Sequence, residues 1–533
     1  MDSRQRTTLI TLVLLLLLFS TSSYAIPAFS RQYGTSCSTC HVDFPKLNDF
    51  GKAFKDAGFK FPKDDESFIK VPPVLLGAPA QKDLWPHTIW PGSIPGLPPI
   101  GLRYNHFFQL TSRNRNAFNL QIPAAGGNTP GPFIPRTDFQ PGFFSIFMAG
   151  NFGSDIAFWV DDDISVAGSN SNGGLGDGYL KFVNLGRLFK LPTDALSLRV
   201  GQFELDLPFS QARTWNLSGW DIYDEANVGV LNSVVGFPVV NNGFAFSTPG
   251  EGVEFSGGHQ YGGYHYSLAI VNQNTTGAAA APANISPQNG VAFSSDSNFK
   301  DLYGRFSYRF NLERDPASRH EIQAAGATGP RDHTYLNLGT FYFYGRSVQR
   351  FSGVLSDGTT PNIVTAREPF YRVGGDFSFN YRTFNLFGIY MLGHDHNLLP
   401  IVPGGQAATP PLPSAFLSSG AAKFNGGFLE ADYLALPWLM AIMRWDSVHS
   451  SADMINGIGA DASAPVSPNF LSPVRATRNR FTPGIQFLIH ANIKTSFEYQ
   501  IRPQQVVYVP GSNVRLTNPF RTNTAVAGLE FVY

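Results

Sequence analysis

The sequence predicts an all-β transmembrane barrel of about 16 antiparallel strands, preceded by a small α-helical module. Three observations predict this fold class. Charged residues make up 15% of the 533 residues and aromatic residues 14%, with 47 phenylalanines. Long stretches alternate apolar and polar side chains with a period of two. After Ala25 no second long apolar stretch occurs, so a closed barrel is the remaining way to cross a bilayer.

The first 25 residues have the pattern of a secretory signal peptide. Arg4 and Arg6 precede an apolar run over 9–19, and residues 23–25 form a small-x-small cleavage site. The run is too short to span roughly 30 Å of hydrocarbon, which argues against a membrane anchor. We therefore expect export and a mature chain that begins at residue 26.

The only two cysteines stand in the motif Cys37-Ser38-Thr39-Cys40-His41. Thiols at this spacing reach the two vinyl groups of one porphyrin, and the adjacent histidine is placed as an axial ligand of the iron. A thioredoxin-like pair would need a βαβ context, and a zinc site would need two more soft ligands nearby. Neither is present. We predict one covalently attached haem c, with Cys37 and Cys40 as attachment sites and His41 as ligand.

A short helix is expected behind the motif. Apolar residues recur every three or four positions over 47–57, and Gly58 stands where a C-cap glycine belongs. The helix would cover one side of the haem or simply pack as an amphipathic helix. Gly51 weakens it or permits close approach to the macrocycle. Residues 26–61 thus form a predicted monohaem cytochrome c module.

The sixth iron ligand stays open at this point. His87, His106 and Met148 are the nearest candidates along the chain, and an open or water-ligated iron is an alternative. Residues 62–100 contain nine prolines, so we expect an extended Pro-rich linker there. Trp85 and Trp90 within it would line the haem, sit at a membrane interface or only pack.

Residues 101–533 are predicted to form the barrel. Over 302–312, 371–382 and 491–502, aromatic and aliphatic residues alternate with polar or charged ones. This pattern indicates one face toward lipid and one toward the lumen. A soluble sandwich also alternates, but it would carry more surface charge and fewer rings.

Sixteen strands are expected, and short and long connections alternate between them. They lie near 101–112, 141–150, 154–165, 178–187, 196–207, 251–259, 262–273, 300–312, 334–349, 369–381, 383–394, 424–435, 437–449, 478–490, 491–502 and 523–533. The connection 313–333 breaks the alternation, since it should be short. Segment 208–250 has room for two more strands, which would give about 18.

An even strand count places both barrel ends on the periplasmic side of a bacterial outer membrane. The last strand carries Leu529, Phe531 and Tyr533 on one face, as terminal strands of such barrels usually do. The haem module would therefore enter from the periplasm. It would lie below the barrel or inside it as a plug.

The chain resembles the fused monohaem cytochrome–porins of the outer membrane, whose best-known members oxidise iron. About 35 residues carry the resemblance: Pro27-Ala28-Phe29-Ser30-Arg31-Gln32-Tyr33-Gly34, the Cys37–His41 motif, Phe44-Pro45-Lys46-Leu47-Asn48, Phe50-Gly51-Lys52-Ala53-Phe54-Lys55 and Gly58-Phe59. The remaining residues resemble the family only in that they too have the pattern of a barrel. Tyr33 replaces a threonine and Lys52 an arginine of the iron-oxidising members, which leaves the substrate undetermined.

The resemblance implies electron transfer across the outer membrane, from an extracellular donor such as ferrous iron to a periplasmic electron carrier. One alternative is an outer-membrane porin or channel that the haem module gates or plugs. Another is a haem sensor or peroxidase with an open iron site. The formal net charge is zero, so nothing indicates a nucleic acid partner.

Weaker candidate sites lie in the barrel. Six cations are expected in the lumen, where they would suit anion passage or line a wet interior: Arg305, Arg309, Arg372, Arg382, Lys494 and Arg502. Asp161-Asp162-Asp163 and His394-Asp395-His396 are expected at the outer rim. Oxygen and imidazole ligands there would collect ferrous iron, or these are solvated loop residues.

Overall fold

The computed structural model describes residues 28–43, 45–61, 65–84, 93–96, 99–111, 137–165, 174–192, 194–210, 214, 216–224, 249–272, 299–312, 334–354, 361–395, 422–453, 459–460, 468–469, 474–502, 506–508, 515–517 and 523–533. The predicted signal peptide, Trp85, Trp90, His87 and His396 fall outside these residues. Among the described helices, none is both long and apolar enough to cross a bilayer.

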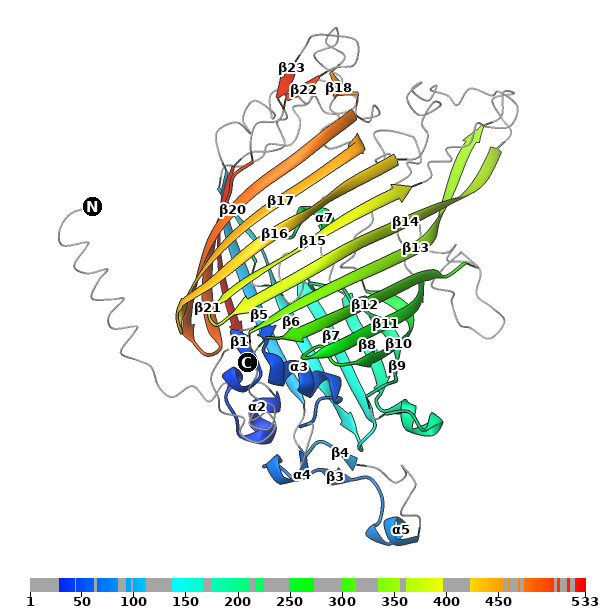
Figure 1. Ribbon diagram of the computed structural model, residues 1–533, viewed down its shortest axis with the longest axis vertical. Coiled ribbons are helices and arrows are strands. Elements are labelled where there is room, and N and C mark those ends of the chain that lie inside the picture. Colours follow the sequence, from blue (N-terminus) through cyan, green and yellow to red (C-terminus); the bar gives the residue numbers. More distant parts are fainter. Residues whose placement is uncertain are drawn as a thin grey trace, which may run out of the picture.

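Sixteen antiparallel strands form one closed barrel (Figure 1). They are β5 (Ile100–Thr111), β6 (Thr137–Phe152), β7 (Ile156–Ser165), β8 (Gly174–Phe182), β9 (Ser197–Phe203), β10 (Gly250–Gly258), β11 (Gly263–Asn272), β12 (Asp301–Asn311), β13 (Tyr335–Val354), β14 (Pro361–Tyr381), β15 (Phe384–Asp395), β16 (Ala422–Leu436), β17 (Leu439–Asp453), β20 (Val474–His490), β21 (Ile493–Gln500) and β24 (Thr524–Val532). The last strand pairs with the first, with Phe531 opposite Tyr104. The predicted barrel is confirmed.

The strand count is settled between β9 and β10. These strands pair directly, from Gly250 opposite Phe203 to Ser256 opposite Ser197. Because the barrel closes on sixteen strands with β9 and β10 as neighbours, the alternative with two further strands is wrong. The predicted strand over 178–187 also ends early, because a 3₁₀ helix, η2 (Leu185–Phe189), follows β8.

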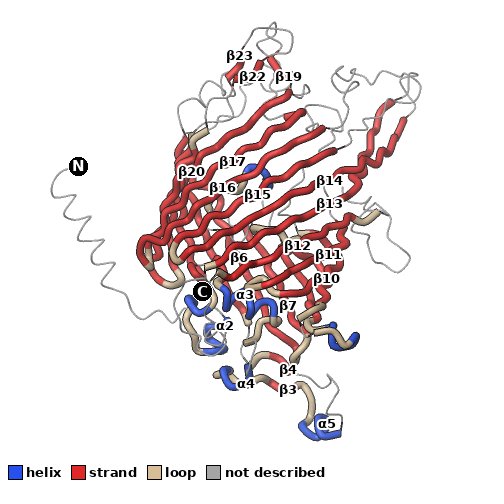
Figure 2. The backbone as a smooth tube through the Cα atoms, in the orientation of Figure 1, coloured by secondary structure: helices blue, strands red, loops and turns tan. Residues whose placement is uncertain are grey.

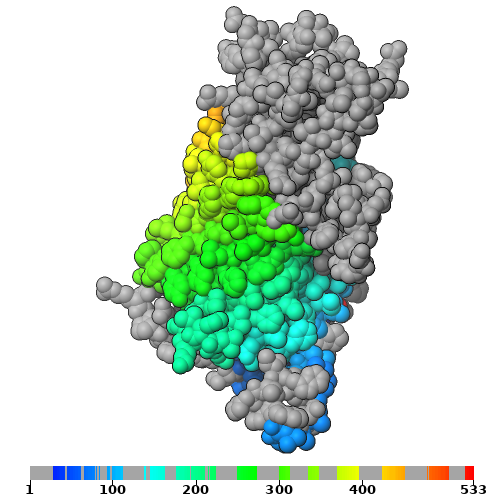
Figure 3. Space-filling view, turned by 90° about the vertical axis from the view of Figure 1, so that its right-hand side faces the viewer, coloured from blue at the N-terminus to red at the C-terminus, as the bar shows by residue number. Residues whose placement is uncertain are grey.

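The alternation of side chains is the lipid-and-lumen pattern expected of a membrane barrel. In β12, Leu302, Phe306 and Phe310 are 44–50% exposed on the outer face, whereas Arg305 and Arg309 are buried inside. On the face drawn in Figure 3, the segments coloured from cyan to yellow pack side by side into one continuous surface. A closed antiparallel barrel with an even strand number and an apolar outer surface is the architecture of bacterial outer-membrane proteins.

The N-terminal module, residues 28–61 without Phe44, lies at one mouth of the barrel (Figures 1 and 2). It comprises α2 (Ala28–Tyr33), η1 (Cys37–Thr39), β1 (His41–Asp43), β2 (Lys46–Leu47) and α3 (Asp49–Asp56). Tyr33, Phe54 and Phe61 form its core, with ring centroids 4.4–6.0 Å apart. Ala149 and Ala157 of the barrel wall belong to the same cluster, so the wall completes the core of the module.

Helix α3 is the helix expected behind the motif. Asn48 caps its N-terminus by accepting a hydrogen bond from the Gly51 N–H at 2.9 Å. Gly58 follows its C-terminus with φ +80°, and the Phe59 N–H donates to the Phe54 carbonyl at 2.9 Å. A residue with a Cβ adopts that φ at a cost, which explains the glycine.

The Pro-rich linker contains more regular structure than expected. Short helices α4 (Asp65–Phe68) and α5 (Pro79–Leu84) and the strand pair β3 (Val74–Leu75) and β4 (Ser93–Ile94) lie within it. Phe68 and Ile69 pack against the core of the module. These apolar contacts hold the start of the linker against the module, although the linker is rich in proline.

The segment after β9 turns into the lumen instead of running across the surface. Its helix α7 (Asp221–Asp224) lies within the barrel in Figure 1. Trp220, Ile222 and Tyr223 are almost fully buried and join the largest hydrophobic cluster of the molecule. Small strand pairs, β18 (Gly459–Ala460) with β19 (Pro468–Asn469) and β22 (Val506–Tyr508) with β23 (Arg515–Thr517), lie at the end away from the module (Figures 1 and 2).

Candidate cofactor cavity

Cys37, Cys40 and His41 all line one cavity of about 370 Å³. The cavity lies between the module and the barrel wall. We call it the motif cavity. The structure thus brings the three residues of the motif together around one shared cavity.

The walls of the motif cavity are mostly apolar and aromatic. The module contributes Phe29, Phe54 and Phe59, and the barrel contributes Phe147 and Trp159. Trp159 joins the two sides, since its ring lies 5.7 Å from that of Phe59 and 6.1 Å from that of Phe147. Such walls exclude water and accept a large flat apolar group.

The turn that carries the motif is held against α3 by Asn48. Its side-chain amide donates to the carbonyls of Ser38 at 3.2 Å and Thr39 at 3.0 Å, and its backbone N–H donates to the Cys40 carbonyl at 2.9 Å. Gly51 lies directly behind, where a Cβ would stand 2.1 Å from the Cys40 oxygen. Close approach of the helix to the motif therefore requires glycine here. The sequence reasoning missed Asn48, although Asn-Asp before an apolar helix is an N-cap signal.

Burial sets the protonation of the motif residues. It lowers the pKa of His41 to about 4, so the imidazole is neutral at physiological pH. The His41 Nδ1 lies 3.2 Å from the Pro45 carbonyl, which can only accept, so Nδ1 carries the proton and Nε2 the lone pair. Burial also raises the pKa of Cys40 to about 12 and raises that of Cys37. Both sulfurs are therefore thiols, and the donor set fits a covalently attached haem with one histidine ligand.

Two of the three candidates predicted for the sixth ligand, His106 and Met148, do not line the cavity, and the third, His87, lies outside the described residues. His106 lies on the outer face of β5, stacked on Tyr104 and Phe139 at 6.4 and 5.9 Å. Met148 alternates with Ser145, Phe147 and Ala149, which line the cavity, and so it points away. His41 is the only histidine, and no methionine is present, among the described lining residues.

Ion pairs and polar contacts hold the module in the barrel. Both Asp49 carboxylate oxygens accept from the Arg309 guanidinium, each at 2.6 Å. Lys46 lies 3.7 Å from Asp432 of β16, four strands away from β12 in the barrel order. The Arg31 guanidinium also donates to the Ile100 carbonyl at 2.7 Å, at the start of the barrel. Together these contacts hold the module at the mouth of the barrel.

Most of the cations that we expected in the lumen contact a charged or aromatic partner. Arg305 pairs with Asp376 at 3.1 Å, Lys494 with Glu530 at 3.2 Å, and Arg502 with Asp221 at 3.6 Å. Arg372 is buried between the rings of Phe370 and Phe424, and Arg309 pairs with Asp49. Arg382 is exposed in the turn after β14, so its assignment to the lumen is wrong. Arg305, Arg372 and Lys494 thus contact partners in the wall, whereas Arg309 pairs with the module and Arg502 with α7.

The two clusters expected at the outer rim lie on different sides of the barrel. Asp161 is in β7 and lines the motif cavity, and His394 is in β15 and stacks on Tyr371 at 5.1 Å. These two strands are eight positions apart in the barrel order, on opposite walls. Within the described part of the chain, no group of three His, Cys, Asp or Glu side chains is arranged to hold a metal ion. That these clusters collect ferrous iron stays a prediction, because His396 lies outside the described residues.

No protein-family model matches the sequence, and none of the curated proteins matches it. Solved outer-membrane proteins are similar in structure. OmpT of Vibrio cholerae matches at 7% identity over 83% of this chain and 98% of its own, with a TM-score of 0.39. OprB of Pseudomonas putida matches at 11% identity over 81% and 94%, with a TM-score of 0.43. OmpF of Salmonella typhi, in complex with daunomycin, matches at 9% identity over 83% and 98%, with a TM-score of 0.41.

Proposed function

We propose that this chain is an outer-membrane c-type cytochrome in which Cys37 and Cys40 attach one haem and His41 binds its iron. One observation carries the proposal: both thiols and the imidazole line the same apolar cavity. When bound, haem supplies a centre that accepts and releases one electron at a time. The remainder of the chain positions this centre and shields it.

The roles of the surrounding residues follow from their contacts. The Pro45 carbonyl orients the His41 ring so that Nε2 carries the lone pair for iron. Aromatic residues of the module and the wall, Phe54, Phe59 and Trp159 among them, exclude water from the cavity. A dry, rigid surrounding lowers the reorganisation that accompanies electron transfer.

The path of the electrons is part of the same proposal. The module lies at the barrel end where β5 begins and β24 ends, and this end faces the periplasm in barrels with an even strand count. We assign the acceptor to a periplasmic electron carrier and the donor to the extracellular side, with ferrous iron as the first candidate. The resemblance of residues 27–59 to the iron-oxidising cytochrome–porins supports this assignment.

Haem attachment is tested first. The full chain is produced in a host that matures c-type cytochromes, denatured, and examined for haem that stays on the polypeptide. The pyridine haemochrome spectrum then gives the number of thioether bonds. We expect two in the native protein, one in Cys37→Ala or Cys40→Ala and none in the double variant. A folded barrel that never retains haem would refute the proposal.

The donor is tested second, by anaerobic stopped-flow mixing of the haem-loaded protein with ferrous iron. Fast appearance of the reduced haem band supports iron as donor. Reduction by dithionite but not by iron would keep the cytochrome and remove iron. His41→Met serves as the matched control, because it changes the ligand and the spectrum while the attachment cysteines stay in place.

A channel plugged by the module is the second candidate. The closed barrel with its polar lumen favours it, since this architecture by itself is that of a channel. Planar-bilayer recordings of the native protein and of Asp49→Asn separate the two functions. A conductance of the size expected for an open pore, larger in Asp49→Asn than in the native protein, favours the channel. No conductance in either protein, together with a redox-active haem, favours electron transfer.

A further inference from the structure

The turn between β8 and β9, which contains η2, presents three large apolar side chains to its surroundings. Leu188, Phe189 and Leu191 are 76%, 68% and 47% exposed. Val183 precedes η2, and its Cγ1 atom would lie 3.2 Å from a Cβ on Gly58 of the module. The turn is therefore at the end of the barrel that carries the module, which faces the periplasm in barrels with an even strand count.

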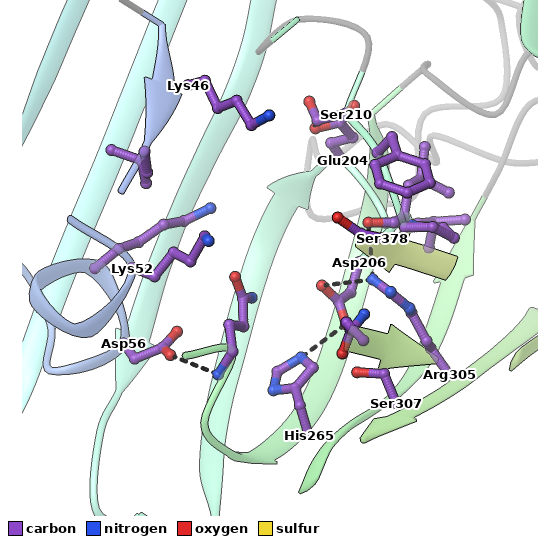
Figure 4. A pocket seen from close by; sticks show the side chains of 18 of the residues that line it. Lys46, Lys52, Asp56, Glu204, Asp206, Ser210, His265, Arg305, Ser307 and Ser378 are labelled. Carbon is purple, nitrogen blue, oxygen red and sulfur yellow. Dashed lines mark hydrogen bonds and ion pairs between the residues drawn. The ribbon is translucent and has the colours of Figure 1, made fainter. Parts of the chain in front are cut away.

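The chain that follows η2 leans over the outer face of the barrel wall. Figure 4 shows His265 of β11 on the lumen side, where it pairs with Asp206 at 2.9 Å. Its neighbour Tyr266 therefore points outward, and the Tyr266 hydroxyl donates to the Ala195 carbonyl at 2.8 Å. Gly257 of β10 lies opposite Tyr266 on the same face, and a Cβ there would collide with the same carbonyl oxygen. The end of the turn is thus on the side of the wall that faces lipid.

The outer face beside the turn has the composition of a membrane–water boundary. Tyr264 of β11 and Tyr308 of β12 lie opposite each other and are exposed. Tyrosine and tryptophan rings gather at the level of the lipid headgroups in membrane proteins. On the two strands that the turn connects, Leu180 lies opposite Val200, and both are exposed on the outer face. The apolar residues of the turn therefore continue a surface that the barrel presents to lipid.

Basic residues stand among the exposed apolar ones. Arg187 and Lys190 are exposed on either side of the two most exposed apolar residues. Two acids lie close to the turn, because Asp155 is 3.9 Å from Arg187 and Asp194 is 3.6 Å from His259. The side chains of Arg187 and Asp155 are 61% and 39% exposed, so this pair holds the guanidinium only weakly. Guanidinium and ammonium groups bind phosphate oxygens through stronger, charge-assisted hydrogen bonds.

The turn presents these side chains from a defined backbone. The Lys190 N–H donates to the Arg187 carbonyl at 3.1 Å, and the Leu191 N–H donates to the Gly186 carbonyl at 2.9 Å. Asn184 and Lys190, at the two ends of η2, have left-handed φ values of +60° and +58°. Residues other than glycine adopt such values at a cost, so the surrounding contacts fix this shape.

We propose that η2 and the two residues after it anchor the barrel in the periplasmic leaflet of the membrane. Leu188, Phe189 and Leu191 enter the acyl region, and Arg187 and Lys190 bind the phosphate groups of anionic phospholipids. Interleaved basic and large apolar residues are typical of segments that lie in a membrane interface. The position beside the lipid-facing wall favours lipid over a periplasmic protein as the partner. The proposal does not depend on the haem, because none of these five residues lines the motif cavity.

Insertion of the apolar residues is tested with Phe189→Trp in the full chain. The protein is reconstituted into nanodiscs of phosphatidylcholine and phosphatidylglycerol, in which both membrane faces are open to solvent. The emission of the new tryptophan is the difference between this variant and the native protein. We expect it to shift to the blue and to be quenched by phospholipids with brominated acyl chains, but not by acrylamide in the water.

Leu84→Trp is the matched control. Leu84 is 69% exposed, as Phe189 nearly is, but it belongs to α5 of the linker, which lies away from the barrel wall in Figure 1. The tryptophan at this position should be quenched by acrylamide and not by brominated lipid.

The basic residues are tested by native mass spectrometry of protein released from the nanodiscs, which counts the phospholipids that each chain retains. The double variant Arg187→Gln, Lys190→Gln should retain fewer phosphatidylglycerol molecules than the native protein and as many phosphatidylcholine molecules. Lys70→Gln removes an exposed lysine of the linker, outside the turn, and should retain as much phosphatidylglycerol as the native protein.

The heat-dependent migration of each barrel in gel electrophoresis verifies that the variants fold. Quenching of the tryptophan at position 189 by acrylamide would place it in water and overturn the proposal. Protection from both quenchers would reveal a protein contact, with a second copy or another partner, and overturn it as well. Equal retention of phosphatidylglycerol by the native protein and the double variant would overturn the role of the two basic residues.

Discussion

Asp49 and Arg309 lie 260 positions apart in the sequence, yet their side chains meet through two parallel contacts of 2.6 Å. The pair joins helix α3 of the module to strand β12 of the barrel wall. Their side chains are only 7% and 2% exposed. The Arg309 guanidinium also lies 3.5 Å from the centre of the Tyr335 ring. This pair is the most deeply buried ionic contact between module and barrel among those described above.

Breaking the pair should loosen the module. Asp49→Asn leaves the Arg309 charge buried without its counter-charge, and we expect module opening to become easier by about 3–5 kcal/mol. Native-state proteolysis, read out as cleavage within residues 28–61, measures this opening. The double variant Asp49→Asn, Arg309→Met should recover part of the loss. Equal protease resistance of Asp49→Asn and the native protein would show that the pair does not hold the module.

Gly51→Ala should disturb the motif turn. The added Cβ would meet the Cys40 carbonyl oxygen at 2.1 Å, so the helix or the turn must shift. We expect a loss of about 1–3 kcal/mol in stability, as for other overpacked sites, and less haem on the polypeptide. Thermal unfolding and the haem-to-protein absorbance ratio measure the two effects. Gly375→Ala is the control, because its Cβ would have its nearest neighbour at 3.6 Å.

Trp220 should anchor the segment that enters the lumen. Its ring stacks on Phe428 at 4.5 Å, and its Nε1–H donates to Glu430 at 2.9 Å. We expect Trp220→Ala to cost about 3–5 kcal/mol in unfolding experiments, as for other buried tryptophans. Trp438→Ala, at a position that is 50% exposed, should cost far less. Similar losses in both variants would mean that Trp220 does not anchor this segment.

Asp65 should make the stability of the module depend on pH. Burial raises its pKa above the ordinary 3.8, although the Phe61 N–H and the Tyr33 hydroxyl, at 2.7 and 2.8 Å, act in the opposite direction. Just above pH 3.8 the folded chain therefore binds more protons at this site than the unfolded chain. Its contribution to the unfolding free energy falls as the pH rises through the raised pKa. Asp65→Asn should flatten this dependence in thermal scans that start at pH 3.8 and go upward.

Local patterns were sufficient to locate the sixteen strands and the helix behind the motif. A strand is recognisable from alternating side chains, because successive residues point to opposite faces. In β12, for example, Phe306 is exposed on the outer face whereas its neighbour Arg305 is buried inside. Cys37, Cys40 and His41 also stand close together in the sequence, so a short stretch of residues is enough to identify them. The structure confirms that the three line one cavity.

The strand count and the partners of the charged residues required the tertiary structure. Whether segment 208–250 adds strands depends on the pairing of β9 with β10, which no local pattern reports. Asp161 is predicted at the rim because it stands in a run of three aspartates. It lines the motif cavity instead, because β7 begins beside the module, where Ala157 belongs to the module's core.

The sequence by itself therefore determined the barrel class, the alternation of its faces and the three motif residues, since each depends on contacts close along the chain. Only the tertiary structure decided that Asp49 meets Arg309, and that Asn48 and Gly51 shape the motif turn from behind. Asn48 and Gly51 contact the motif turn from only about ten positions away, within the module. The contact of Asp49 with Arg309 arises when the barrel closes around the module. Closure joins residues hundreds of positions apart, and their pairing leaves no periodic signal in the sequence.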